Sequence, residues 1–396
     1  MDVQNAIKYT QWFMAFLAIP HRYKRKLSTK KKLSSAVGLV VMNVLIFWNI
    51  SFRSIDMLTV ERNFDEKILL FAPWSFLVVI NIKYIFMIFR SNDIIMIIEH
   101  IKMDWIEKKS PEEELIMVRN SQLCNRITLC FMVLMYVSGS LYNIVIPFVI
   151  PILLHSKPNT SDRIPIFDGY DIFFNAQVSP IYEITFCFQV YAVIIGFSIL
   201  IFMCHLTIVS VTHACGQIQI INYLIRYLIA DIMDINNIHN KISMIISRHI
   251  RVLSFAKNVR KILLELCLLE MGASTVLICI DEYCFLKMLE TNDIANMIPF
   301  GMLFVCLNFN ILVLCYFSEL LNSQFIEIGT ESSMTDWYRF PQKIRSYLVL
   351  IICMSQRPQK LTAGGIIDLS YGTYIQVLKT GFTYFQMLRA ADLKKK

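Results

Sequence analysis

Four polar side chains near the end of the chain recur at a spacing that would line a water-filled path. Gln376, Lys379, Thr383 and Gln386 follow one another at intervals of three or four residues in an otherwise largely apolar segment. At about 100 degrees per residue in a helix, they fall within an arc of about 80 degrees, and the aromatic side chains between them point elsewhere. A helix in lipid with one such edge indicates a pore-lining segment.

Patterns that support catalysis or metal binding are absent from the sequence. It contains no Gly-x-Ser-x-Gly turn, no glycine loop for phosphate, no His-Glu-x-x-His pair and no Cys-x-x-Cys pair. His213 and Cys215 lie close together without further ligand candidates, so we assign no metal and no cofactor. The sequence does not favour an enzyme.

The composition defines the elements that must position the polar edge. Of the 396 residues, 56% are hydrophobic and 17% are charged, and the mean hydropathy is +0.53. These values are typical of an integral membrane protein. Three windows hold no charge and are each long enough to cross a hydrocarbon core of about 30 Å, namely residues 33–52, 127–154 and 297–318. The net charge of +8 then reflects topology and attraction to anionic lipid, not nucleic-acid binding.

Four further windows qualify as spans although each contains an ionisable side chain. They are residues 68–89 with Lys83, residues 184–212 with His205, residues 262–280 with Glu265 and Glu270, and residues 366–388 with Asp368 and Lys379. Such positions persist in a membrane mainly inside a bundle or against water. Lys83 lies near one end of its window, so we expect it to extend its amine to the interface. The sequence thus predicts an all-α membrane protein with seven transmembrane helices.

The distribution of cationic residues predicts the orientation, because loops rich in Lys and Arg stay in the cytoplasm. The alternate connecting segments that include the N-terminus hold 26 Lys and Arg residues, and the opposite set holds 10. We therefore expect a cytoplasmic N-terminus and an extracellular C-terminus. The predicted order is a cytoplasmic segment 1–32, transmembrane helices one to four in 33–212 with a long outer loop at 155–180, cytoplasmic anchor helices at 213–261, transmembrane helices five and six at 262–320, a cytoplasmic anchor segment at 321–365, a pore-lining helix at 366–390 and an extracellular tail at 391–396.

Two local patterns refine this layout. The apolar run 347–354 is too short to span, Arg357-Pro358 ends it, and Gly364-Gly365 allows a flexible break. The seventh segment is therefore predicted to be split into a cytosolic half and a membrane half. In the outer loop, Asn159-Thr-Ser161 forms a glycosylation sequon on the side where glycosylation occurs.

Four motifs follow one another in the segment from Cys306 to Arg389. They are Cys315-Tyr316-x-x-Glu319, Asp336-Trp337-Tyr338, Ser355-Gln356-x-Pro358 leading to Leu361-Thr-Ala-Gly364, and Thr383-Tyr384-Phe385. With these motifs, the segment resembles the C-terminal third of insect odorant receptors. Their order and spacing make the match specific. The first 200 residues are similar to that family in layout only.

The resemblance implies an odorant-binding subunit of a ligand-gated, non-selective cation channel in the plasma membrane of sensory neuron dendrites. Members of the family form tetramers around a pore made by the last helix, and an odorant-specific subunit joins a common co-receptor. The chain lacks the longer cytoplasmic loop that the co-receptor carries before the fifth span, which favours the odorant-specific class. Four copies of Lys379 would ring a pore with positive charge, so we expect few copies in each tetramer.

The resemblance also assigns site residues. Alignment on Thr383-Tyr384-Phe385 places the family's constriction at Met387 and Ala390, on the face of the polar edge. The family binds a small apolar volatile or pheromone in the outer half of the bundle, where a cavity needs apolar walls and one or two polar groups. The side chains expected there are Trp74, Val78, Tyr136, Ser140, Asn143, Phe186, Val190, Ser274 and Ile278. Ordinary helix packing would equally account for each of them singly.

Three other protein classes share parts of this pattern. An insect gustatory receptor has the same architecture and a different terminal signature. A G-protein-coupled receptor would activate cytosolic partners, but its usual orientation is opposite to the one predicted here. A transporter would require paired broken helices in two corresponding halves, and the sequence shows no such pair.

Overall fold

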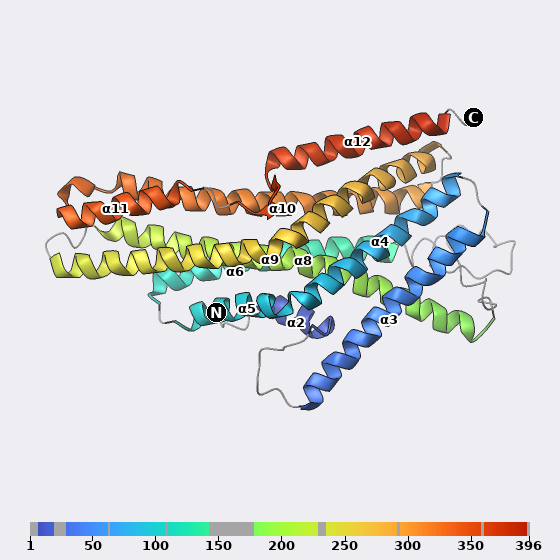
Figure 1. Cartoon of the computed structure of the whole chain (residues 1–396), viewed down its shortest axis with the longest axis horizontal. Helices are drawn as coiled ribbons and strands as arrows, with labels where there is room; N and C mark the ends of the chain where they lie inside the picture. The colour runs from blue at the N-terminus through green and yellow to red at the C-terminus, as the bar shows by residue number, and fades with distance from the viewer. Residues whose placement is uncertain are drawn as a thin grey trace.

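The computed structural model of the chain describes residues 7–19, 29–61, 64–107, 109–141, 178–228, 235–290, 294–357 and 360–393. These residues form an elongated bundle of long helices (Figure 1). The elements are α2 (Lys8–Phe16), α3 (Thr29–Thr59), α4 (Phe64–Phe89), α5 (Ser91–Ile106), α6 (Pro111–Ser140), α8 (Ile181–Arg226), α9 (Ile235–Glu290), α10 (Ile294–Met334), the 3-10 turn η4 (Trp337–Arg339), α11 (Gln342–Ser355), β1 (Thr362–Ala363), β2 (Ile367–Asp368) and α12 (Tyr371–Leu393).

Among the described residues, six helices are long and apolar enough to cross a membrane. These segments are Leu33–Thr59, Leu70–Phe89, Pro111–Ser140, Ile181–Arg226, Ile238–Glu290 and Phe300–Met334. Each overlaps one of the six predicted windows that precede residue 320. The seventh window falls on α12, which is not one of the six and whose apolar residues are interrupted by the polar edge.

Helices α8 and α9 are much longer than a membrane requires. At 1.5 Å per residue, the 56 residues of α9 extend for about 84 Å, and the 46 residues of α8 for about 69 Å. No helix end occurs where the sequence predicted a change from membrane span to anchor, at residues 212 and 261. In α9, apolar residues continue to recur at helical spacing past Arg248 and Arg251, because one face of the helix stays buried there.

Helix α8 runs through the centre of the bundle and packs against α6, α9 and α10. Its residues from Ile195 to Gly216 are all buried. Two hydroxyl groups on this stretch are satisfied within the helix, since Ser210 and Thr212 donate to the carbonyls of Leu206 and Ile208 at 2.7 and 2.8 Å. The core is therefore built around one helix that is buried on all sides along this stretch.

The N-terminal segment, predicted only as a cytoplasmic extension, contributes a helix to this core. Helix α2 packs on α8, where Thr10 lies 2.8 Å from Nε2 of the buried His205. Thr128 of α6 lies 2.9 Å from Nδ1 of the same ring. Tyr84 of α4 donates a hydrogen bond of 2.7 Å to the carbonyl of Leu17, just after α2. His205 thus joins three helices.

The break predicted at Gly364-Gly365 is an ordered hairpin between α11 and α12 and not a flexible link. Strands β1 and β2 pair antiparallel, with Thr362 opposite Asp368 and Ala363 opposite Ile367. Gly364 and Gly365 make the turn with φ of +62° and +73°, a region that side chains other than glycine rarely occupy. The fold is therefore not purely helical, and α12 begins at Tyr371 instead of residue 366.

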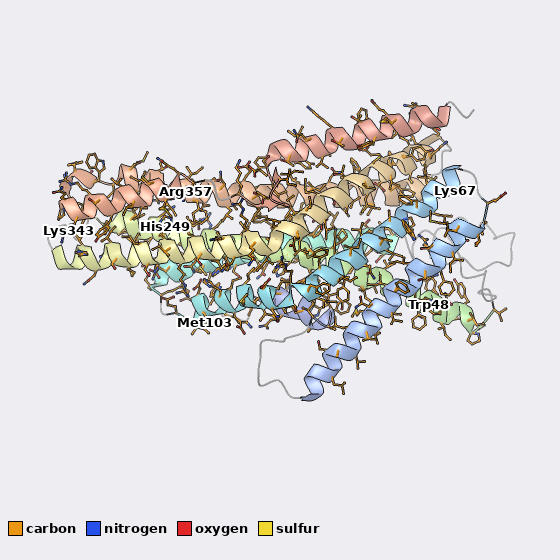
Figure 2. The ribbon with its side chains drawn as sticks, viewed as in Figure 1. Trp48, Lys67, Met103, His249, Lys343 and Arg357 are labelled. Atoms are coloured by element: carbon orange, nitrogen blue, oxygen red, sulfur yellow. The ribbon has the colours of Figure 1, made fainter. Side chains whose placement is uncertain are left out.

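The hairpin separates α11 at one end of the bundle from α12, which extends toward the other end (Figure 1). Lys343 and Arg357 lie at the end that carries α11, whereas Lys67 lies near the opposite end, where α3 and α4 meet (Figure 2). These two ends are called the α11 end and the opposite end below. The α11 end is the one predicted to face the cytoplasm.

Candidate functional site

Helix α12 lies on the edge of the bundle and uses one narrow face to pack against α9 and α10. Val377, Gly381 and Phe385, spaced by four residues, form the buried face of α12, and Val377 and Phe385 are 8% and 6% exposed. Because this buried stripe is so narrow, the rest of the described chain leaves most of the surface of α12 uncovered.

The predicted pore residues lie on the side of α12 opposite this stripe. Gln376, Lys379, Thr383 and Gln386 are all exposed. At about 100 degrees per residue, the centre of this polar edge is roughly 180 degrees from the middle of the buried stripe. The structure therefore brings the four side chains to one surface that the described part of the chain does not cover.

The predicted gate residues share that surface. Met387 is 62% exposed and Ala390 is also exposed. On the flanks, Ile375, Phe382 and Tyr384 are 49%, 54% and 51% exposed. A polar edge bordered by large apolar side chains suits a helix that meets water along one line and neighbouring helices or lipid on both sides.

Glycine at position 381 sets how closely α12 approaches α9. A Cβ atom at Gly381 would lie 3.1 Å from Cγ2 of Ile278 and 3.9 Å from both carboxylate oxygens of Glu282. Ile278, one of the predicted ligand residues, is completely buried at this contact. At this level α12 therefore lies in close contact with α9.

The hairpin fixes the other end of α12 to both α9 and α10. The Gly364 N–H donates a hydrogen bond of 2.8 Å to the Leu264 carbonyl of α9. The Leu361 N–H donates to Oγ of Ser318 on α10 at 3.0 Å. Ser370 then accepts from the Thr373 N–H at 3.2 Å and begins α12 as an N-cap.

A buried ion pair crosses the middle of the bundle, although Lys83 was expected to reach the interface. Lys83 of α4 and Glu270 of α9 are 1% and 4% exposed, and Lys83 Nζ lies 2.8 Å from Glu270 Oε2. The other carboxylate oxygen accepts from Asn310 of α10 at 2.6 Å and from Ser274 at 3.2 Å. Lys83 stays inside because this network satisfies its charge there.

Two further acidic side chains on α9 have carboxylate oxygens without a hydrogen-bond partner among the described residues, and one of them, Glu282, lies beside α12. These oxygens are both of those of Asp281, which is 2% exposed, and Oε2 of Glu282. The predicted span 262–280 ends just before these residues, but α9 continues to Glu290. Two acidic residues after an apolar run were the signal that could have singled them out.

The predicted ligand residues are distributed over four helices. Trp74 and Val78 lie on α4, Tyr136 and Ser140 on α6, Phe186 and Val190 on α8, and Ser274 and Ile278 on α9. Asn143 lies outside the described residues, as does Asn159 of the sequon.

Contacts place these residues in different surroundings. Tyr136 shares a hydrogen bond of 2.7 Å with Ser198 of α8. Trp74 donates to Ser54 of α3 at 2.9 Å, and Phe186 stacks on Tyr182 within α8. Ser274 bonds to Glu270, as described above, and Ile278 touches α12. Tyr136 is thus tied by a side-chain hydrogen bond to the centre of the bundle between α6 and α8.

Around Tyr136, small residues bring α4, α6 and α8 together. A Cβ atom at Gly139 of α6 would overlap the ring of Phe197 at 2.1 Å. Gly196 of α8 faces Ile80 and Phe76 of α4, at 3.2 and 3.4 Å from its Cβ position. Small residues at such crossings allow close packing of helices in lipid.

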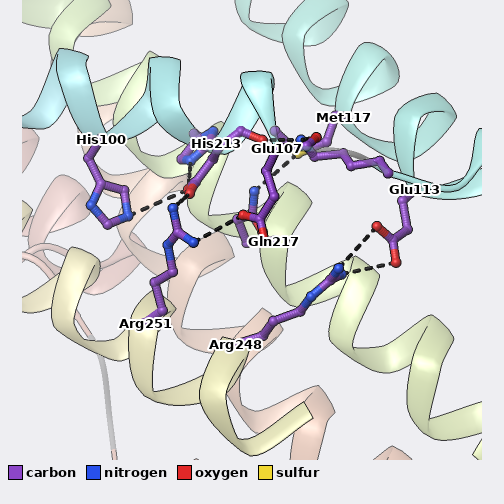
Figure 3. A network of polar contacts seen from close by, with 10 residues as sticks. His100, Glu107, Glu113, Met117, His213, Gln217, Arg248 and Arg251 are labelled. Atoms are coloured by element: carbon purple, nitrogen blue, oxygen red, sulfur yellow. Dashed lines mark hydrogen bonds and ion pairs between the residues drawn. The ribbon is translucent and has the colours of Figure 1, made fainter. Parts of the chain in front are cut away.

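The α11 end holds a network of charged side chains that the sequence did not reveal (Figure 3). Asp104 of α5 accepts a hydrogen bond of 2.8 Å from Nε2 of His213 on α8 and pairs with Arg251 of α9. Arg248 of α9 holds both oxygens of Glu113, at 3.0 and 3.3 Å. The network joins α5, α6, α8 and α9, which contribute these residues from distant parts of the sequence.

The network shifts the protonation of its members. Burial raises the pKa of Asp104, but the hydrogen bond from His213 and the nearby His213, His100 and Arg251 charges outweigh it, so the pKa lies below its usual value. Burial lowers the pKa of His100 more than Asp104 raises it. The cluster therefore favours an ionised Asp104 beside a neutral His100.

Comparison with known proteins identifies the family. The family model described as 7tm Odorant receptor matches residues 63–382. Odorant receptor Or2 of Anopheles gambiae is 27% identical over 142 residues, and odorant receptor 2a of Drosophila melanogaster is 24% identical over 141 residues. Each match covers 36% of this chain and only 36% of the relative.

Solved structures support the same fold over nearly the whole chain. The olfactory receptor OR5 of Machilis hrabei in complex with eugenol has a TM-score of 0.77 at 14% identity, covering 99% of this chain and 100% of that one. The same receptor in a second structure gives 0.76 at 14% identity, covering 98% and 99%. At this identity the likeness concerns the fold alone. Because the family model spans most of the sequence, the chain belongs to the insect odorant receptor family.

Proposed function

We propose that the chain is the odorant-binding subunit of a ligand-gated, non-selective cation channel, with α12 lining the pore. The observation that carries this proposal is the exposed polar edge of α12, which lies opposite the stripe that packs on α9. In a membrane, a line of exposed polar side chains is costly unless it meets water. Gln376, Lys379, Thr383 and Gln386 form such a line. A tetramer of such helices would enclose a conduction path.

The proposed orientation places the N-terminus and the α11 end in the cytoplasm and the end of α12 outside the cell. The excess of Lys and Arg in the segments of the α11 end supports it. The length of α8 and α9 adds that the bundle extends into water beyond the membrane, because both helices are longer than a hydrocarbon core of about 30 Å requires. The sequon at Asn159 would then be extracellular.

The proposed assembly is a heterotetramer in which this chain joins the odorant co-receptor. Lys379 supports few copies per channel, since it is exposed on the polar edge and repels cations at close range. Ile375 and Phe382 beside the edge would pack against neighbouring subunits or lipid. The channel belongs in the plasma membrane of sensory dendrites.

The proposed ligand is a small apolar volatile bound in the half of the bundle beyond the Lys83–Glu270 pair. The junction of α4, α6 and α8 at Gly139 and Gly196 offers apolar walls with Tyr136 and Ser198 as polar groups. The nine residues expected from the sequence are retained as candidates, with Tyr136 the best supported. A gustatory role is less well supported, because the matching family model is that of odorant receptors.

The proposed mechanism is a shift between closed and open arrangements. A ligand that is buried better in the open arrangement raises the population of that state. Movement of α9 would reach α12 through the Ile278–Gly381 contact, while the hairpin holds the first turn of α12 on α9 and α10. Met387 and Ala390 would then separate from the channel axis.

Patch-clamp recording with and without the co-receptor tests channel, partner and ligand together. We expect current evoked by members of a chemically broad odorant panel only when both subunits are expressed, and a reversal potential typical of a non-selective cation pore. A response that needs a G protein and persists without inward current would contradict the proposal. Epitope tags at both ends provide the control for orientation.

A further inference from the structure

A groove between α6, α8 and α10 near the α11 end is not part of the pore or of the ligand half. It is lined by α6 between residues 116 and 126, by α8 between residues 215 and 226, by Tyr227 directly after α8, and by α10 between residues 316 and 327, and it encloses about 660 Å³. The name basic groove is used for it below. Its volume would accommodate a polar group far larger than a water molecule.

The floor of the basic groove is a chain of hydrogen-bonded amides. Asn120 donates to Gln219 at 2.9 Å, Gln219 donates to Gln324 at 3.1 Å, and Gln324 donates to the Glu327 carboxylate at 2.6 Å. These bonds hold α6, α8 and α10 in a fixed arrangement. The groove is therefore a built feature of the fold.

One lining residue has an unused acceptor. Asn222 of α8 is 4% exposed, and its Oδ1 has no hydrogen-bond partner within the described ranges. A buried carbonyl oxygen without a partner is costly and uncommon in native proteins. Its place in the wall of the groove indicates that a bound molecule supplies a hydrogen-bond donor.

The rim is positively charged. Arg119 and Arg126 of α6 are exposed, and neither forms an ion pair with any residue that the structure describes. Arg226 also lines the groove but is already held by Glu331. With Arg226 neutralised by Glu331, two arginines without an ion-pair partner among the described residues remain beside the single lining carboxylate of Glu327, so the groove favours an anion.

The position of the groove relates it to lipid. Arg126 immediately precedes the charge-free stretch of α6 that begins at Ile127, so it lies where the helix enters hydrocarbon. Beyond it, an open apolar hollow on α6 is lined by Leu129, Met132, Val133, Tyr136, Val137, Ser140 and Leu141. Arg119, Arg126, Val133 and Ser140 are spaced by seven residues, so they drift by only about 20 degrees per step. The polar groove and the apolar hollow thus share one face of α6.

We propose that this face of α6 binds an inositol phospholipid of the inner leaflet. The head group lies in the basic groove and an acyl chain follows the apolar hollow. Arg126 binds the phosphodiester and Arg119, about 10 Å farther along the helix, binds a phosphate on the ring. A ring hydroxyl donates to Asn222 Oδ1. This inference rests on the orientation given under Proposed function and concerns a regulatory ligand distinct from the odorant.

A lipid is favoured over a soluble anion because the two halves of the site have different chemistry. A phosphate alone would use the arginines and leave the apolar hollow empty. Phosphatidylserine would satisfy one arginine with its phosphodiester, but its only other anionic group, a carboxylate, is accompanied by an ammonium group that the arginines repel. Basic pockets between helices at the cytoplasmic face are known to suit phosphorylated inositol head groups.

The test is a titration of the purified full-length chain with short-chain phosphatidylinositol bisphosphate, read by native mass spectrometry and by thermal shift. Phosphatidylserine and phosphatidylcholine of the same chain length, and soluble inositol trisphosphate, serve as comparison ligands. The variants are Arg119→Gln with Arg126→Gln, and separately Asn222→Leu. The matched control is Lys257→Gln with Arg260→Gln, which removes two exposed cations from α9.

We expect one saturable site, weakened at least about tenfold in the double arginine variant and about fivefold in Asn222→Leu, with the control unchanged. Equal affinity of the double arginine variant and the unmodified chain would overturn the proposal. So would equal binding of phosphatidylserine, or binding of soluble inositol trisphosphate as tight as that of the lipid. Should the arginine variant fail to fold, Asn222→Leu decides alone.

Odorant-evoked current, recorded from the same variants with the co-receptor, separates this inference from the proposed function. If the arginine and asparagine variants lose lipid binding while the unmodified channel gives a measurable current, the result concerns the lipid site only. Absence of any current in the unmodified channel contradicts the channel proposal and leaves the lipid titration intact as its own result.

Discussion

At the scale of single residues, the described part of the chain is organised by a few buried polar groups. Lys83 and Glu270 neutralise one another in the middle of the bundle, and Asn310 and Ser274 use the remaining oxygen of the carboxylate. Such a pair adds little net stability when complete, but it is costly to break, because the remaining charge stays buried. It determines which faces of α4, α9 and α10 meet.

Substitution of one partner of this pair should therefore be worse than substitution of both. Lys83→Met leaves an unpaired carboxylate, and we expect a loss of about 3 to 5 kcal/mol in the free energy of unfolding. Lys83→Met combined with Glu270→Gln should recover most of that loss. The melting temperature of the purified protein measures both effects, and equal destabilisation by the single and double variants would contradict the buried pair.

The hairpin turn makes a similar demand on the backbone. Gly364→Ala would place a Cβ at positive φ, 2.9 Å from Cδ2 of Leu268, so we expect at least about 1 to 2 kcal/mol of destabilisation. Gly272→Ala on α9 is the matched control, since nothing lies within 4 Å of its Cβ position. That change should stabilise the helix by about 0.5 to 1 kcal/mol. Thermal unfolding distinguishes the two, and similar effects would argue against the docked turn.

Protonation of His100 and Asp104 at the α11 end makes the stability of the fold depend on pH, and the pKa shifts give the direction of this dependence. The folded-state pKa of His100 lies below 6.5, so the unfolded chain binds more protons as the pH falls through that value, and stability decreases. The pKa of Asp104 is lowered from 3.8, so its contribution persists until the medium is far more acidic. We expect His100→Gln to flatten the fall in melting temperature between about pH 7.5 and about pH 5.5. An unchanged slope would exclude His100 as the source.

At the scale of elements, the junction between α11 and α12 connects the two halves of the molecule. The hairpin is bonded to Leu264 of α9 and to Ser318 of α10, and α12 touches α9 again at Gly381. Helix α12 is thus held at its start and near its middle, while its polar edge stays uncovered. This arrangement suits a helix whose far end moves while its base remains fixed.

Sequence patterns predicted the long elements well and the short ones poorly. Hydropathy located the six helices that are long and apolar enough to cross a membrane, because a run of apolar residues can be recognised without knowledge of tertiary contacts. It missed the hairpin, because strands of two residues are too short to show an alternating hydrophobic pattern. It also missed the packing of α2, because the contact of this helix with His205 depends on the tertiary fold. The pairing of Lys83 with Glu270 was equally invisible, as it joins positions far apart in sequence.

The candidate site shows the same division. The polar edge of α12 is a local helical pattern, so Gln376, Lys379, Thr383 and Gln386 were found together on one exposed surface. The ligand residues depend on how four helices face one another, and Ile278 contacts α12 while Trp74 contacts α3. Helical period cannot resolve which side of a buried helix faces a cavity.

At the scale of the whole molecule, the chain exposes the surface that a channel assembly would cover. Charge in the pore sets the composition of that assembly, because like charges around a narrow path repel strongly. We expect Lys379→Gln to raise cation current through channels formed by this chain without the co-receptor, by at least severalfold over background. Lys379→Arg serves as the charge-matched control. Whole-cell recording measures the effect, and equal currents from the two variants would remove Lys379 from the pore.

Accessibility of α12 to water during stimulation tests the central claim most directly. Cysteine would be introduced at Gln376, Thr383 and Gln386 of the polar edge, and at Val377 and Phe385 of the packed face, in a chain whose three exposed native cysteines are replaced by serine. With the co-receptor present and odorant applied, a charged thiol reagent should alter current at the edge positions only. A change of current confined to the packed-face positions, or no change at either set of positions, would contradict a pore lined by α12.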